Sequence, residues 1–440
     1  MSLEADYLQQ LLRQYDTTPY PNIPLHHSHR EDTSMLYLHN LQTPYYLRNR
    51  RRIETAGKRI LDVGCGSGFS TLALAEANPG AQITGIDLSP RSVEVARERL
   101  AHHGFPDAQF HVIGVEELAQ LGEKFDYINC DEVIYILPDP VAGLASLTAV
   151  LAPDGIVRAN LHSEIVRAPL LHAQKMFTIL GLDGSRSEEE EVALSRETME
   201  KMIDGAQLKK LAWTPFSSLH DNTEWYRMNY LLRGDKGFTV PDMFRMLAQS
   251  NLELVNMLLW PTWDPRRLFK EGELPQLLVE RYDRMSLEER LQLTELINSS
   301  HRLLDFWCGH RGEAQPFVPL TRWSDAQLTA STLHLHPQLA TPRLKEFLLY
   351  CLESGEPFNI NQHMRVPYGE PIAIDGMEEA LLPLWNGPQP YANFQRQWVR
   401  LAVRRTTVRK PVFEHEARSG LRRFVTAMEA LAYLMVEAGL

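Results

Sequence analysis

The sequence RILDVGCGSGFS, from Arg59 to Ser70, decides the fold of this chain. A short apolar run rich in β-forming residues ends in glycines at alternate positions, and an Ala-rich apolar stretch follows. This order indicates a strand, a tight turn and a helix, which bring bare backbone close to a ligand at the helix N-terminus. The spacing is G-x-G-x-G, and Phe69 stands where the last glycine of a dinucleotide fingerprint would fall. No Lys-Ser/Thr pair follows, so the stretch is not a Walker loop.

Two acids near this turn indicate a nucleoside that carries an ammonium group. Asp62 precedes the first glycine, where it would repel a pyrophosphate and suits an ammonium group. The run QITGID, residues 82–87, predicts a second strand that ends in Asp87. This is the place where such folds carry a ribose-binding acid, and Asp87 can accept hydrogen bonds from both ribose hydroxyls. Ser89 and Pro90 then predict the start of the next helix.

The segments LDVGCGSG and GIDLS resemble the first two motifs of class I S-adenosylmethionine-dependent methyltransferases in residue type, order and separation. The resemblance implies a transferase whose cofactor is S-adenosyl-L-methionine. The alternative is a set of structural glycines in an unrelated α/β domain. The cofactor-binding residues that we expect on this basis are Asp62, Gly64, Cys65, Gly66, Gly68, Asp87, Leu88, Glu116 and Asn129.

Alternating strands and helices predict a parallel, doubly wound Rossmann-like sheet. Further strands are expected at 109–113, 124–130 and 156–160. Ligands bind at the carboxyl ends of such strands, which places Glu116, Asn129 and His162 on the same rim as the glycines. Gly114 stands where many members of the family carry an acid, so the adenine amine is left to Glu116, Glu117 or a backbone carbonyl.

The rest of the chain predicts three regions. Residues 1–57 are expected to form an N-terminal strap and helices, and 58–264 the methyltransferase domain with a helical insertion at about 165–235. A sixth strand is expected at 252–259. Residues 265–440 are expected to form a mainly α C-terminal domain, whose last helix carries an apolar stripe from Leu421 to Met435 and stops at Gly439. Such an insertion usually covers the acceptor pocket or makes a dimer contact. A homodimer is therefore one of the alternatives.

The segment 18–29 contains three prolines that hold it extended, together with Tyr20 and three histidines. It suits a strap over an active site. It is similar to the entry segment of a bacterial group of methyltransferases that adds a regulatory and a C-terminal domain. That group includes outer-membrane-protein lysine methyltransferases, so the similarity implies a protein-lysine acceptor as one alternative.

Composition and missing motifs narrow the function. A formal net charge of -11 argues against broad nucleic-acid affinity. The sequence after the fourth strand is NCDE in place of D/N-P-P-Y/F, which argues against methylation of base amines or glutamine amides. Four cysteines without a CxxC pair predict a reducing compartment and no metal site. No signal peptide and no apolar run of bilayer length is seen, so we expect a cytoplasmic protein without membrane contact.

Methyl transfer from a sulfonium needs an aligned acceptor and one base to remove its proton. The candidates for this base are His162, His29, Tyr20 and Tyr135. The acceptor is expected to be a small molecule or a protein, with protein lysine as an alternative and a non-catalytic nucleoside-binding scaffold as a further one. Fold alone does not separate these alternatives.

Overall fold

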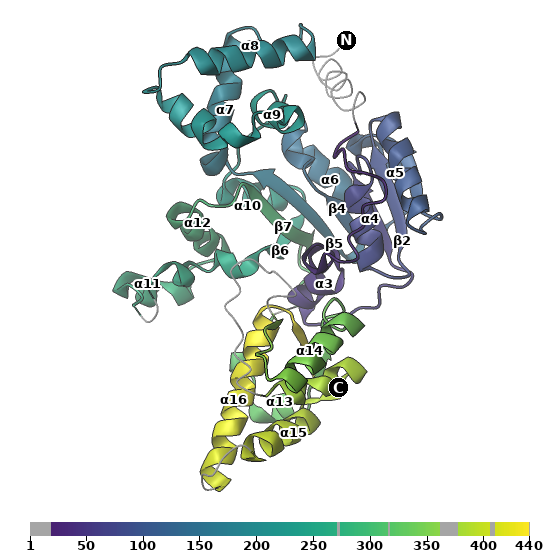
Figure 1. Ribbon diagram of the computed structural model, residues 1–440, viewed down its shortest axis with the longest axis vertical. Coiled ribbons are helices and arrows are strands. Elements are labelled where there is room, and N and C mark those ends of the chain that lie inside the picture. Colours follow the sequence, from purple (N-terminus) through teal and green to yellow (C-terminus); the bar gives the residue numbers. More distant parts are fainter. Residues whose placement is uncertain (1–18, 271–272, 316, 361–376, 405–409, 440) are drawn as a thin grey trace.

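The computed structural model describes residues 19–270, 273–315, 317–360, 377–404 and 410–439. Three parts follow one another along the long axis in Figure 1. A helical part lies at one end, the sheet with its covering helices in the middle, and the C-terminal part at the other end. No helix in the described ranges is both long enough and apolar enough to cross a membrane.

The middle part is a seven-stranded sheet with the order β3-β2-β1-β4-β5-β7-β6. The first five strands pair in parallel, whereas β7 runs antiparallel to both β5 and β6. The predicted doubly wound α/β fold is therefore confirmed. The strands are β1 (Arg59–Val63), β2 (Gln82–Asp87), β3 (Gln109–Val112), β4 (Phe125–Cys130), β5 (Leu151–His162), β6 (Leu252–Met257) and β7 (Leu303–His310).

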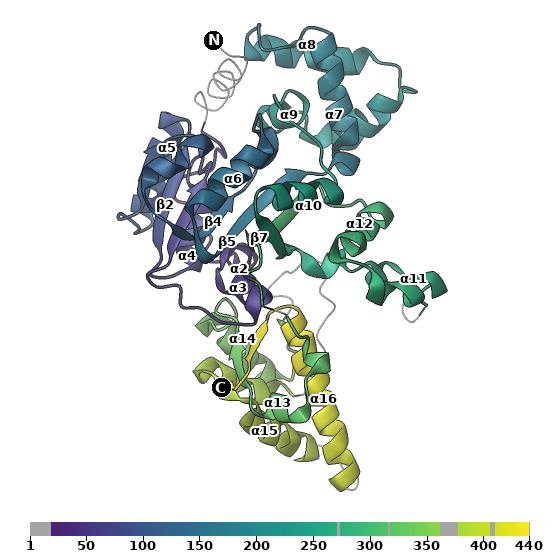
Figure 2. The same ribbon diagram turned by 180° about the vertical axis from the view of Figure 1, so that it is seen from behind.

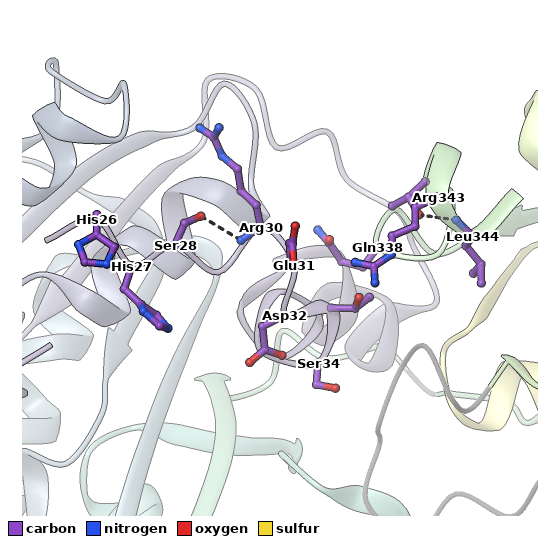
Figure 3. Close-up of a pocket in the computed structure, with 12 residues that line it drawn as sticks. His26, His27, Ser28, Arg30, Glu31, Asp32, Ser34, Gln338, Arg343 and Leu344 are labelled. Carbon is purple, nitrogen blue, oxygen red and sulfur yellow. Dashed lines mark hydrogen bonds between the residues drawn. The ribbon is translucent and has the colours of Figure 1, made fainter. Parts of the chain in front are cut away.

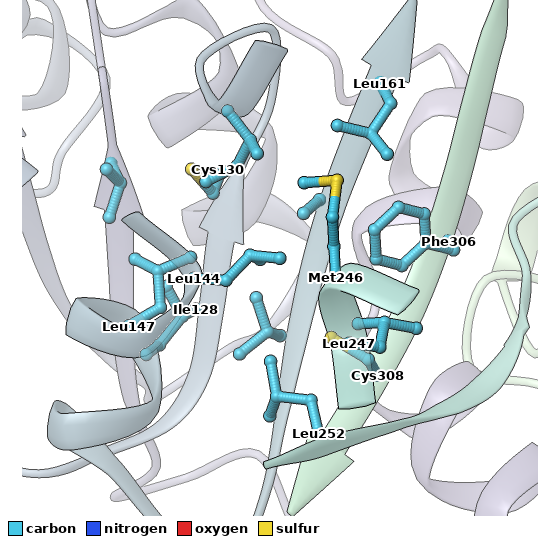
Figure 4. Close-up of a cluster of buried hydrophobic side chains, with 14 of the residues drawn as sticks. Ile128, Cys130, Leu144, Leu147, Leu161, Met246, Leu247, Leu252, Phe306 and Cys308 are labelled. Atoms are coloured by element: carbon cyan, nitrogen blue, oxygen red, sulfur yellow. The ribbon is translucent and has the colours of Figure 1, made fainter. Parts of the chain in front are cut away.

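Helices cover both faces of this sheet. On one face, α6 (Pro140–Val150), α10 (Val240–Gln249) and α12 (Leu287–Ile297) contribute to a core with β4, β5 and β7 (Figures 2 and 4). Leu147, Met246 and Phe306 are among its buried side chains. On the other face, α3 (Gln42–Asn49), α4 (Phe69–Ala77) and α5 (Pro90–His102) form a second core with the strands, which also contains Trp307. α2 (Thr33–His39) lies against α4.

The strand β7 corrects the predicted boundary at residue 264. Residues 303–310 form a sheet strand that pairs with β5 from Ile156↔Gly309 to His162↔Leu303. The sequence between β6 and β7 folds into α11 (Gln276–Arg281) and α12, and this helical stretch resembled the start of a new domain. The sheet therefore extends to His310, well past the predicted end of the methyltransferase domain.

The predicted insertion forms a helical part with its own core. It contains α7 (Glu164–Ile179), α8 (Glu188–Lys201) and α9 (Thr223–Tyr230). Phe177, Met199 and Tyr226 are buried in that core. These helices stand over the carboxyl end of β5 (Figure 1).

The C-terminal part combines helices with a three-stranded sheet of order β10-β8-β9. The last predicted helix is too long, because α16 ends at Ala430 and the chain then turns at Ala432, whose φ is 52°. Residues 434–437 form β10 and pair antiparallel with β8. The elements are α13 (Asp325–Thr329), β8 (Thr332–Leu335), α14 (Pro342–Ser354), β9 (Gln389–Pro390), α15 (Tyr391–Arg404), α16 (Lys410–Ala430) and β10 (Leu434–Glu437).

Candidate functional site

A cavity of about 360 Å³ lies at the carboxyl ends of β1, β2 and β4. The glycine turn after β1, Asp87 at the end of β2, and the loop after β4 all contribute to its lining. Tyr20 from the strap and Met228 from α9 complete the wall. The site is therefore formed by the sheet, the N-terminal strap and the helical insertion.

A wider groove of about 800 Å³ lies between the strap and the start of α14 (Figure 3). Its lining is mostly polar, with exposed residues such as His26, Arg30, Glu31 and Arg343. It lies away from the strand ends, where open α/β sheets bind their ligands. We therefore assign the ligand site to the smaller cavity.

The three glycines of the turn have positive φ angles of 71°, 50° and 80° at Gly64, Gly66 and Gly68. Such angles favour glycine because L side chains rarely adopt them. A Cβ on Gly68 would lie 2.7 Å from the Cα of Ala96, so this glycine allows close packing on α5. Gly64, Cys65 and Gly66 line the cavity, whereas Gly68 is not part of its lining.

The strap lies directly on the glycine turn. The Ser67 N–H donates to the Tyr20 carbonyl at 2.8 Å, and the Ser67 hydroxyl donates to the Pro21 carbonyl at 2.7 Å. The buried Arg99 donates to the carbonyls of Ile23, Pro24 and Ser67 at 2.7–3.0 Å. The strap is thus fixed as one wall of the cavity by backbone carbonyls that accept these hydrogen bonds.

Asp87 faces the cavity with a half-buried carboxylate. Its Oδ2 accepts from the Gly66 N–H at 2.9 Å, and its Oδ1 accepts from the Ser89 N–H at 2.9 Å. Burial raises the pKa of Asp87, and the backbone donors oppose this rise. Each carboxylate oxygen can accept a further bond, so both hydroxyls of a ribose can be bound here.

The structure separates the two acids proposed for the adenine amine. Glu117 caps its own helical turn, because its carboxylate accepts from the Gly114 N–H at 3.1 Å. Glu116 lines the cavity, as does Leu88. Among the candidates, Glu116 is therefore the acid whose position suits the amine.

Asp62 and Asn129 lie beneath the glycine turn and do not line the cavity. Asp62 is 1% exposed and accepts from Ser70, Thr71 and Asn129 at 2.6–2.9 Å. Burial raises its pKa. Asp62 and Asn129 thus support the turn from inside the protein, and their role in binding the cofactor stays a prediction.

Glu132 is a cavity residue that the sequence did not single out. Its φ is 60°, which is unusual for a residue with a side chain and is a form of strain found at functional sites. Its N–H donates to the buried Asn160 Oδ1 at 2.9 Å. Tyr135 and Arg302 donate to its carboxylate. The only sequence signal was the acidic pair Asp131-Glu132 at the end of β4, and Asp131 lines the cavity too.

The four candidate bases lie in different surroundings. Tyr20 lines the cavity and is 41% exposed. His29 is buried, packs against the Phe69 ring at a tilt of 48°, and donates from Nε2 to the Phe69 carbonyl at 3.0 Å. Tyr135 and His162 are buried and stack on each other at 3.7 Å. His29, Tyr135 and His162 are not among the residues that line the cavity.

Comparisons with known proteins agree with this geometry. A family model described as a methyltransferase domain matches residues 54–230. A ubiquinone biosynthesis O-methyltransferase of Actinobacillus pleuropneumoniae is 36% identical over 120 residues, which are 26% of this chain and 50% of that protein. The chain thus spans only half the length of that relative. Residues 54–230 belong to a class I S-adenosylmethionine-dependent methyltransferase domain.

Two further comparisons extend over more of the methyltransferase. An uncharacterized protein of Synechococcus sp. is 28% identical over 312 residues, which are 71% of this chain and 72% of that protein. The solved structure of PKMT2 from Rickettsia typhi superposes with a TM-score of 0.60 at 15% identity, over 92% of this chain and 75% of that one. At this identity the likeness concerns the fold alone, and it extends through the C-terminal part.

The cofactor of this methyltransferase is S-adenosyl-L-methionine, which supplies an electrophilic methyl group when bound. The residues present fit it. Side-chain-free glycines stand against the cavity, Asp87 offers acceptors for ribose hydroxyls, and Glu116 can accept from an adenine amine. In the described part of the chain no group of His, Cys, Asp and Glu is arranged to hold a metal ion.

Proposed function

We propose that this enzyme methylates a primary amine at the end of an apolar stem, most simply the side chain of a lysine in a protein. One observation carries the proposal. Two carboxylates, Asp131 and Glu132, line the cavity on the side where the strap and the insertion meet the loop after β4. Carboxylates attract an ammonium group and accept hydrogen bonds from the neutral amine that remains once its proton has passed to solvent, whereas they would repel an acidic acceptor.

The other residues of that side suit an aliphatic stem. Tyr20, Pro21, Met35 and Met228 line the cavity with apolar atoms. A methionine adapts its shape to a flexible chain, and apolar walls bind methylene groups while the polar tip finds its partners. A cavity with apolar walls and two acids in its lining therefore matches a lysine better than a flat phenol.

The protonation states of Glu132 and Tyr20, on the acceptor side of the cavity, do not change in the neutral pH range. Burial opposes ionisation of Glu132, but the nearby His162 ring, the charge and hydrogen bonds of Arg302, and the Tyr135 hydroxyl hold its pKa well below the usual range. Burial and the charge of Glu132 raise the pKa of Tyr20, so its phenol stays protonated. Glu132 is thus an acceptor for amine N–H groups rather than a base, and Tyr20 can orient the amine.

Label transfer tests the proposal. The enzyme is incubated with methyl-tritiated S-adenosylmethionine and a cell extract, and the protein fraction is hydrolysed in acid and chromatographed. We expect label in the protein fraction that co-elutes with methylated lysine. Label confined to small molecules, or released from protein by mild base as from a methyl ester, would contradict it.

A further inference from the structure

A chain of polar side chains, buried at Arg167, Asp235 and His162 and partly exposed at Arg302 and Glu132, connects the helical insertion to the acceptor side of the cavity. Arg167 on α7 donates to Asp235 at 2.8 Å, and Asp235 Oδ1 lies 2.6 Å from His162 Nδ1. His162 Nε2 lies 2.9 Å from Arg302 Nη1, and Arg302 donates from both Nη atoms to Glu132. The side chains of Asp235 and His162 are 0% and 2% exposed. The chain ends at the one member that lines the cavity, Glu132.

The hydrogen-bond partners fix the form of His162. A guanidinium only donates, so Nε2 of His162 must accept from Arg302. The proton of the neutral ring is then on Nδ1, where it is donated to Asp235. The lone pair of His162 is therefore in use, and the ring cannot take a proton from an acceptor while Arg302 stays in place. His162 orients Arg302 instead.

Glu132 depends on this support because its own backbone is strained. The left-handed φ of 60° turns the Glu132 side chain away from the path of β4. The Asn160 side-chain oxygen accepts a hydrogen bond from the backbone N–H of Glu132. Asn160 also donates to the Asp131 carboxylate, so one buried amide fixes both acids. Beyond this clamp, the direction of the Glu132 carboxylate is set by Arg302 and Tyr135.

We infer that Arg302, oriented by His162 and Asp235, is a positioning residue that aims the Glu132 carboxylate at the amine of the acceptor. The inference rests on the proposed amine acceptor. The planar fork of Arg302 reaches Glu132 and His162 at once, which a lysine ammonium on a flexible stem does not reproduce. The same chain ties the insertion to the cavity, because Asp235 also binds Arg167 and Gln174 on α7.

A pair of cofactor analogues tests this without the natural acceptor. S-adenosylhomocysteine lacks the transferable methyl, and sinefungin carries an amine in its place. An amine at that position meets Glu132, so the wild type should bind sinefungin about tenfold or more tightly than S-adenosylhomocysteine, as a charge-assisted hydrogen bond allows. Glu132→Gln should reduce this preference to about threefold or less.

The decisive variant is Arg302→Lys, which keeps the positive charge and removes the planar guanidinium group that contacts Glu132 and His162 together. Calorimetry should show that the preference for sinefungin falls to about threefold or less, as in Glu132→Gln, while affinity for S-adenosylhomocysteine changes less than about threefold. Arg245→Lys is the matched control, since Arg245 pairs on the surface with Asp242 and should leave both affinities unchanged. The variants' melting temperatures are recorded with both ligands absent.

Each outcome decides the inference. An Arg302→Lys variant that keeps the preference would show that Arg302 acts only through its charge, and one that loses both affinities equally would show a merely structural role. Either result overturns the positioning role. Failure of the proposed function is seen separately, because label on a non-amine acceptor would refute the amine whether or not the preference depends on Arg302.

Discussion

At the scale of single residues, Asp87 shows how one carboxylate serves fold and ligand together. Its two oxygens accept from the backbone N–H groups of Gly66 and Ser89, so it links the glycine turn to the start of α5. The sequence predicts ribose binding for this acid, and the structure adds support of the following helix. The geometry permits both, because the carboxylate also faces the cavity.

Asp87→Ala should weaken binding of S-adenosylhomocysteine by about ten- to a hundredfold and destabilise the ligand-free enzyme by about 1–2 kcal/mol. The loss of affinity reflects the ribose contacts, and the loss of stability reflects two unpaired backbone donors. Calorimetry with a 2′,3′-dideoxy analogue separates the two effects. The wild type should bind the analogue more weakly than the parent, and the variant should bind both alike. A variant that still discriminates between them would show that the ribose is held elsewhere.

At the same scale, the acceptor side was not predictable from the sequence. Glu132 is recognised by its positive φ and by partners at residues 160, 162 and 302, which are far away in the chain. His162 was predicted on the correct rim, but its burial and its bond to Asp235 depend on the insertion. By contrast, the glycine turn and Asp87 were predictable, because each follows directly from local strand-turn-helix sequence.

At the scale of elements, the position of the strap explains why the turn after β1 has a glycine at residue 66. A Cβ on Gly66 would lie 2.2 Å from the Tyr20 carbonyl oxygen. The first obstacle for a side chain there is therefore the strap. Gly66 allows the strap to lie on the turn.

Gly66→Ala should therefore release the strap and weaken S-adenosylhomocysteine binding by about tenfold or more, since the displaced segment carries the Tyr20 and Pro21 wall. Limited proteolysis should cut within residues 19–29 faster than in the wild type. Gly57→Ala is the control, because Gly57 also has a positive φ, of 76°, but has no atom within 4 Å of an added Cβ. Equal proteolysis of the two variants would contradict the role of the strap.

The elements that were mispredicted share one physical reason. The strands β1, β2, β4 and β5 are apolar runs that end in turn residues, so their local pattern was sufficient. The strand β7 was missed because its partners β5 and β6 are separated from it by helices, and β10 was taken as helix because its apolar residues continued the stripe of α16. In both cases strand pairing across a long sequence separation decided the structure.

At the scale of the whole molecule, the N-terminal helices join the C-terminal part to the sheet. Tyr46 on α3 donates to Glu429 on α16 at 3.0 Å, and Arg50 pairs with the same carboxylate at 2.8 Å. His336, after β8, accepts from the Gln338 N–H at Nδ1 and so donates from Nε2 to Thr43 at 3.0 Å. The joint is buried and polar, and it holds His336 in its neutral form.

This joint predicts acid sensitivity. Burial, together with the charge of Arg52, lowers the pKa of His336 to about 3, whereas an unfolded histidine titrates near about 6.5. Below that value the unfolded chain takes up a proton that the folded protein does not, so stability is lost as the pH falls. From pH 7 to 5 this single group should lower the free energy of unfolding by about 2 kcal/mol.

Urea unfolding of His336→Gln at the two pH values measures this contribution. The variant should lose less stability than the wild type on acidification, by about the same 2 kcal/mol. His172→Gln at an exposed position is the control and should keep the wild-type dependence. A His336→Gln variant with unchanged pH dependence would show that His336 is protonated in the folded protein.

The measurement that tests the central claim most directly is a competition between acceptor atoms. The enzyme and methyl-tritiated S-adenosylmethionine are incubated with equal amounts of poly-L-lysine amine groups and a soluble catechol, and label is counted in each. The account predicts label on poly-L-lysine, recovered after acid hydrolysis as methylated lysine, and its loss in Glu132→Gln. Label on the catechol oxygen, with none on lysine, would contradict it.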